Sequence, residues 1–102
     1  MKVQVLHVAD CPNAELLARR AQEVLAALAD VTVSLQLIVD HADAVVLGMH
    51  GSPTLLVDGR DPFPRTNIEP SVSCRLYRDE HGDLRGAPSI NDLRQVLLAG
   101  LP

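Results

Sequence analysis

Two cysteines carry the most reactive side chains of this sequence, and Cys11 stands directly before Pro12 and a segment with helical spacing. A thiol at a helix N-terminus faces unpaired N–H groups and the positive end of the helix dipole, and both stabilise the thiolate. The thiolate is the form that attacks disulfides and binds soft metals. The neighbouring carboxylate of Asp10 opposes this effect because it disfavours a second negative charge. The alternative is that Cys11 is a small apolar residue in a turn.

The second cysteine, Cys74, opens the segment "CRLYR", which is predicted to be a strand. Antiparallel pairing of this segment with the preceding strand places Cys74 opposite Val57, roughly 10 Å or more from Pro53. A disulfide to Cys11 needs Cα atoms within about 7 Å. Direct bridging is therefore not expected unless the loop over residues 60–73 folds back over the site or Cys74 lies on that loop before the strand.

Two of the four histidines are placed where they could support a thiolate at Cys11. His7 lies on the first predicted strand, and His50 stands three residues before Pro53. A nearby imidazolium stabilises a thiolate. No spacing of histidines and cysteines matches a zinc site, so neither a metal nor a cofactor is expected.

Alternating strand and helix patterns position these residues. Val-rich and period-two segments predict strands, and apolar residues three and four apart predict helices. Pro12 suits the first turn of a helix, and Gly48 suits a helix end. The predicted strands are 3–8, 31–39, 54–57 and 74–78, and the predicted helices are 12–28, 41–47 and a terminal helix from residue 90.

The order strand, helix, strand, helix, strand, strand, helix predicts a single α/β domain over residues 1–102. A right-handed crossover makes the first two strands parallel neighbours, and the last two are expected to pair antiparallel on the same sheet. The expected fold is a four-stranded mixed sheet with three helices. The first and third helices should pack on one face and the short second helix on the other.

Composition excludes several classes of partner. The formal net charge of −4 and the absence of a basic run argue against nucleic acid, whose binding is driven by Lys and Arg. No segment approaches the roughly 18 to 20 apolar residues that span a bilayer, so no membrane partner is expected. The N-terminus has no small-residue cleavage site, and a cytoplasmic protein is expected.

Over essentially its whole length the chain resembles the minimal form of the thioredoxin-like superfamily. Cys11 in "CPNA" takes the place of the first cysteine of that family's C-x-x-C motif, and Pro53 in "GSPT" takes the place of its cis-proline. Ala14 stands where the family has its second cysteine, so the usual disulfide within the motif cannot form. The resemblance implies a cis Ser52–Pro53 bond, and it implies that Pro12 and the backbone groups of Ser52 meet the substrate.

The resemblance also implies thiol-disulfide oxidoreductase activity, in which Cys11 forms a mixed disulfide that a second thiol resolves. That thiol would come from glutathione or another low-molecular-weight thiol, from a partner protein, or from Cys74. Two alternatives stay open. Short bacterial chains of this look are sometimes labelled alkylmercury lyase, an activity that needs two thiols for mercury and an acid such as Asp10. A binding module that lost the chemistry is the other, and Ala14 favours it.

Overall fold

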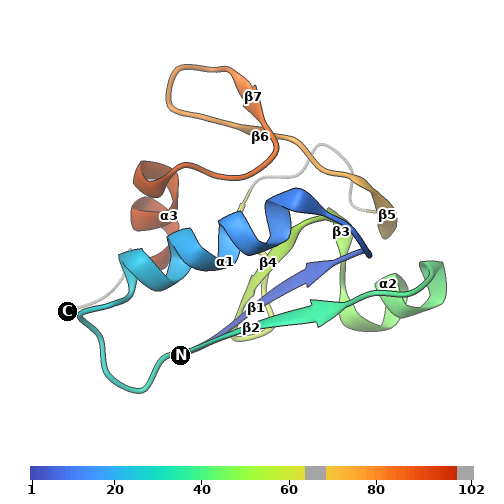
Figure 1. Ribbon diagram of the computed structural model, residues 1–102, viewed down its shortest axis with the longest axis horizontal. Coiled ribbons are helices and arrows are strands. Elements are labelled where there is room, and N and C mark those ends of the chain that lie inside the picture. Colours follow the sequence, from blue (N-terminus) through green and yellow to red (C-terminus); the bar gives the residue numbers. More distant parts are fainter. Residues whose placement is uncertain (64–68, 99–102) are drawn as a thin grey trace.

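The first strand, β1 (Lys2–His7), is the central strand of the main sheet in the computed structural model, which describes residues 1–63 and 69–98. β2 (Thr32–Leu37) runs parallel to β1 on one side, and β4 (Thr54–Val57) runs antiparallel to it on the other. The crossover through a helix explains the parallel pair, because it returns the chain to the same end of the sheet. The fold is therefore α/β with a mixed sheet in the order β2-β1-β4 (Figure 1).

Each helix begins at a residue whose chemistry favours a helix start. Pro12 is the first residue of α1 (Pro12–Val24) and has no N–H to leave unpaired. The side chains of Asp40 and Ser89 accept first-turn N–H groups at the starts of α2 (His41–Leu47) and α3 (Ile90–Leu97). α1 ends earlier than predicted. The apolar spacing continues into the turn after the helix, where Leu25 is buried, and the prediction therefore extended the helix over that turn.

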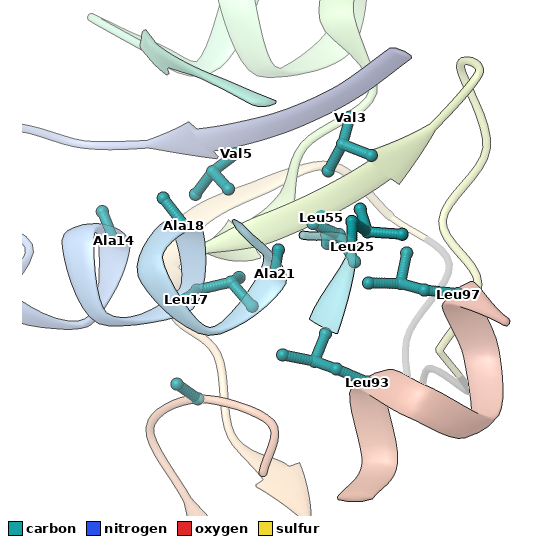
Figure 2. Packing of buried hydrophobic residues seen from close by; sticks show 11 residues of the cluster. Val3, Val5, Ala14, Leu17, Ala18, Ala21, Leu25, Leu55, Leu93 and Leu97 are labelled. Atoms are coloured by element: carbon teal, nitrogen blue, oxygen red, sulfur yellow. The ribbon is translucent and has the colours of Figure 1, made fainter. Parts of the chain in front are cut away.

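The sheet separates two apolar clusters, with α1 and α3 on one face and α2 on the other, as predicted. Neighbouring residues of a strand point to opposite faces, so β1 and β4 each supply both clusters. Figure 2 shows the first cluster, in which Val3, Val5 and Leu55 of the sheet meet Ala14, Leu17, Ala18, Ala21 and Leu25 of α1 and the turn after it, and Leu93 and Leu97 of α3. The second cluster consists of Leu6, Ile38, Ala44, Met49 and Leu56.

The prediction of a fourth strand paired with β4 is wrong. Among the described residues the main sheet has three strands, and the segment after the loop forms β5 (Ser71–Cys74), which pairs in parallel with β3 (His50–Ser52). The expected strand over residues 74–78 is interrupted at Arg75 and Leu76, and the Arg75 side chain is buried. Strand β3 was not expected, since three residues that include a glycine show no apolar alternation.

A small antiparallel hairpin follows, formed by β6 (Tyr77–Arg78) and β7 (Leu84–Arg85), and it projects from the body of the molecule (Figure 1). Residues 64–68 of the predicted loop over 60–73 lie outside the described residues, and its last residues form the start of β5. In the part of the chain that is described, no helix is long and apolar enough to cross a bilayer.

Candidate functional site

Cys11 is the N-cap residue of α1, so it lies at the N-terminus of this helix, as predicted. Its backbone is extended, with φ −78° and ψ 107°, and its side chain makes no capping hydrogen bond. The thiol is partly exposed, and the chain reaches it from the C-terminal end of β1. The sulfur therefore stands at the start of a helix, where unpaired N–H groups and the dipole favour a thiolate.

An open depression of about 430 Å³ surrounds this thiol, and it is lined by His7, Asp10, Cys11, Pro12, Ala14, Glu15 and Leu35. The lining includes two carboxylates and one imidazole. His7 Nδ1 lies 2.9 Å from the carbonyl oxygen of Val8. A carbonyl only accepts, so in neutral His7 the proton sits on Nδ1 and Nε2 is the basic nitrogen.

The structure brings His7 to the depression, but it does not bring His50 there. His50 lies on β3, and its Nδ1 is 3.0 Å from the carbonyl oxygen of Glu69. His50 is not among the residues that line the depression. Of the two histidines considered from the sequence, His7 is therefore the one that lines the depression together with Cys11.

The Ser52–Pro53 bond is cis, as predicted, and both residues are buried. The expectation that Ser52 offers its backbone to an extended substrate stays a prediction, although the Ser52 carbonyl is already paired within the chain. Its carbonyl oxygen accepts the N–H of Arg75 at 3.0 Å, and its Oγ accepts the N–H of Val8 at 3.0 Å. The chain's own β5 segment therefore occupies an acceptor that a substrate strand would need.

Cys74 lies at the end of β5 and is exposed, and its strand partner is Ser52. The predicted register opposite Val57 is wrong, because it assumed that β4 and the following strand pair with each other. β5 pairs instead with β3, which directly precedes Pro53. Since neighbouring strands lie about 4.8 Å apart, Cys74 is much closer to Pro53 than the sequence suggested.

A buried ion pair and a hydrogen bond to Pro53 anchor the segment after Cys74. Arg75 Nη1 lies 2.5 Å from Asp61 Oδ2, and these side chains are 7% and 2% exposed. The Arg75 guanidinium also lies over the ring of Tyr77, 4.6 Å from its centroid. The Tyr77 hydroxyl donates a hydrogen bond to the carbonyl oxygen of Pro53. Phe63 completes the packing with an edge-to-face contact on Tyr77 at 5.3 Å.

Sequence reasoning missed this cluster of Asp61, Phe63, Arg75 and Tyr77. One signal of a local cluster was available, since Phe63 and Tyr77 are the only phenylalanine and tyrosine of the chain and lie in the same region of the sequence. An arginine within a predicted strand reads as a solvent-facing residue, and an aspartate before a proline reads as a turn. Nothing in their spacing indicates that the two charges meet in the interior.

Burial raises the pKa of Tyr77 above its ordinary value of 10.0, because the tyrosinate would lose its hydration. The Arg75 charge opposes this shift, while negative charge on Asp61 and Cys11 adds to it.

The raised Tyr77 pKa predicts a loss of stability at alkaline pH. Above pH 10.0 the unfolded chain loses a proton that the folded protein keeps, so the free energy of unfolding falls as pH rises. Tyr77 is the single tyrosine of a chain without tryptophan, so tyrosinate absorbance reports this group alone. We expect that absorbance to rise together with the loss of helical circular dichroism. A rise of tyrosinate absorbance near pH 10 in a protein that stays folded would contradict this prediction. Tyr77→Phe should lose the part of the pH dependence of the free energy of unfolding that comes from the tyrosine.

Among residues 1–63 and 69–98, no group of three or more His, Cys, Asp or Glu side chains is arranged to hold a metal ion. Cys11 and Asp10 line the same depression, whereas Cys74 does not line it. The depression itself therefore presents one thiol, beside the carboxyl groups of Asp10 and Glu15 and the imidazole of His7.

Comparisons of the chain with family models, with curated proteins and with solved structures found no match.

Proposed function

We propose that this protein is a thioredoxin-like thiol-disulfide oxidoreductase that acts through Cys11. The observation that carries the proposal is the position of this thiol at the N-terminus of α1. It is partly exposed, it makes no capping hydrogen bond, and it lines an open depression. Those three properties are what a reactive cysteine needs, because attack requires both a stabilised thiolate and access.

In the proposed reaction the Cys11 thiolate attacks one sulfur of a disulfide, R–S–S–R. A bond forms between the Cys11 sulfur and that sulfur, and the other half leaves as a thiolate that takes up a proton. A second thiol then attacks the mixed disulfide and releases Cys11. Two electrons pass from thiols to the starting disulfide. The partner in this exchange is a thiol-containing protein or a low-molecular-weight thiol.

The thioredoxin-like part of the proposal draws support from two further features. Helix α1, which begins directly after Cys11, joins the parallel strands β1 and β2. The cis-proline Pro53 directly precedes β4, which is antiparallel to β1. Ala14 remains a departure from the family pattern, since it removes the second thiol of the motif. The resolving thiol must therefore come from elsewhere.

The alternative of soft-metal handling is favoured by Asp10, which lines the same depression as Cys11. In that reaction the carbon–mercury bond of an organomercurial breaks, and the carbon takes up a proton from the carboxylic acid and leaves as a hydrocarbon. Mercury(II) stays bound to two thiolates. Incubation with methylmercury chloride tests this chemistry. Release of methane that Asp10→Asn abolishes would favour the lyase over the oxidoreductase.

The experiment for the proposed function measures reduction of 2-hydroxyethyl disulfide in the presence of glutathione, glutathione reductase and NADPH. We expect wild-type protein to accelerate NADPH consumption and Cys11→Ser to fall to the protein-free rate. Cys74→Ser removes the other, exposed thiol and leaves the helix start intact, and glutathione in the assay can resolve the Cys11 mixed disulfide, so this variant should stay above the protein-free rate. Equal activity of wild type and Cys11→Ser would contradict the proposal.

A further inference from the structure

The strand that carries Cys74 is fixed against the residue that precedes Pro53. Cys74 is the register partner of Ser52, and the next N–H, that of Arg75, donates to the Ser52 carbonyl oxygen at 3.0 Å. Gly51 allows this close approach, because a Cβ at that position would lie 2.8 Å from the Arg75 Cβ. β5 is therefore held tightly along β3 at the point where Cys74 stands.

A bulge in β5 determines the face to which the Cys74 side chain belongs. His50 pairs with Ser71 and Ser52 pairs with Cys74, so two steps along β3 match three steps along β5. Without the extra residue, the partner of Ser52 would be Ser73. Because register partners of a parallel pair point to the same face, the bulge moves the thiol onto the face of the Ser52 side chain.

The Ser52 side chain reaches the end of β1. Its Oγ accepts the N–H of Val8 at 3.0 Å, and Val8 stands three residues before Cys11. The chain beyond Cys74 also returns to the cis-proline turn, since the Tyr77 hydroxyl donates a hydrogen bond to the Pro53 carbonyl oxygen. Two reduced cysteines thus belong to segments that meet at the cis-proline turn.

We propose that Cys74 is the resolving cysteine of this protein, an inference that rests on the proposed exchange at Cys11. The Cys74 thiolate attacks the Cys11 sulfur of the mixed disulfide Cys11–S–S–R. The Cys11–Cys74 bond forms, the sulfur–sulfur bond to R breaks, and RS⁻ takes up the proton that Cys74 released. Overall, one disulfide is reduced to two thiols while the protein dithiol is oxidised to an internal disulfide, which an external thiol later reduces. Cys74 thus supplies the second thiol that the motif lacks, because Ala14 stands in place of its second cysteine.

The test uses one equivalent of 5,5′-dithiobis(2-nitrobenzoic acid) on fully reduced full-length protein, with no other thiol present. Wild type should release two thionitrobenzoate anions per reagent molecule and end as an internal disulfide, two hydrogens lighter by mass spectrometry and without bound label. Cys74→Ser should release one anion and keep the label on Cys11. The label should map to Cys11 by peptide analysis.

A matched variant moves the second thiol by one residue. Ser73→Cys/Cys74→Ser keeps two cysteines and an exposed strand position, but it places the thiol on the other face. We expect its second release to be at least about tenfold slower than that of wild type, since exchange requires the two sulfurs in line and in contact.

The outcomes separate this inference from the proposed function. If Cys74→Ser takes up no label at Cys11, the exchange at Cys11 itself is wrong. If Cys11 takes up the label and wild type keeps it as long as Cys74→Ser does, the exchange stands and the resolving role of Cys74 is wrong. Equal second-release rates in wild type and the Ser73→Cys/Cys74→Ser protein would also overturn the role, because the position of the thiol would not matter.

Discussion

Replacing Arg75 with methionine is expected to lower the free energy of unfolding by about 3–5 kcal/mol. The Asp61 side chain is 2% exposed and its carboxylate lies 2.5 Å from the Arg75 guanidinium. Removing the guanidinium therefore leaves a buried negative charge without that partner. Methionine also loses the contact of the guanidinium with the Tyr77 ring. Urea unfolding followed by circular dichroism measures the loss.

Two controls separate charge from packing in this prediction. The double variant Asp61→Asn/Arg75→Met has no buried charge at the pair and should recover at least half of the loss. Arg85→Met breaks the pair with Asp79 at an arginine side chain that is 62% exposed, and it should cost no more than about 1 kcal/mol. Losses of similar size for Arg75→Met and Arg85→Met would show that the interior pair has no special weight.

Replacing Ala14 with cysteine in the Cys74→Ser protein is expected to restore release of a label bound to Cys11. Cys11 is the N-cap of α1 and Ala14 is the third helical residue, and the side chains at these two positions lie next to each other. Ala14 is 2% exposed and lines the depression, so the new sulfur would be beside Cys11 and shielded from solvent. The change should convert a persistent mixed disulfide into an internal one.

Ala18→Cys in the same background is the matched control for this change. It is also buried on α1, but it lies one turn further along the helix, about 6 Å by the helical rise, and it should leave the label in place. The measurement is the mass of the protein after one equivalent of the aromatic disulfide. A label that persists in the Ala14→Cys protein would mean that Cys11 does not face the first turn of α1.

The helix start at Cys11 could be predicted from sequence because local chemistry determines it. A proline one residue after the cysteine, followed by apolar residues at helical spacing, leaves little choice of where α1 begins. The sides taken by the three helices were also predictable. Side chains alternate between the two faces of a strand, so the apolar β1 and β4 present buried residues to both layers, and the apolar faces of the helices must cover them.

The pairing of β5 could not be predicted because it depends on contacts between distant, weakly patterned segments. β3 has three residues and one glycine, so neither its existence nor its partner is visible in the apolar pattern. The bulge that matches Ser52 with Cys74 shifts the register by one residue, and such a shift reverses which face a side chain joins. The wrong prediction for the position of Cys74 follows from the failure to predict β3.

The Asp61–Arg75 pair escaped prediction for a different reason. Charged residues are read from sequence as exposed, since burying an ion costs several kcal/mol unless a partner compensates. The compensation here comes from a residue 14 positions away in the chain and from an aromatic ring. Only the folded arrangement shows that the guanidinium is satisfied.

The measurement that tests the central claim most directly compares the rate of Cys11 with a neutral disulfide in the folded and the urea-unfolded Cys74→Ser protein at neutral pH. With one thiol left, every reaction event belongs to Cys11, and the unfolded chain gives the rate of the same thiol without a helix. Stabilisation of the thiolate by the start of α1 predicts that the folded protein reacts about two- to fivefold faster, although its thiol is only partly exposed. A folded protein that reacts no faster than the unfolded chain would contradict the claim and leave Cys11 as a small residue in a turn.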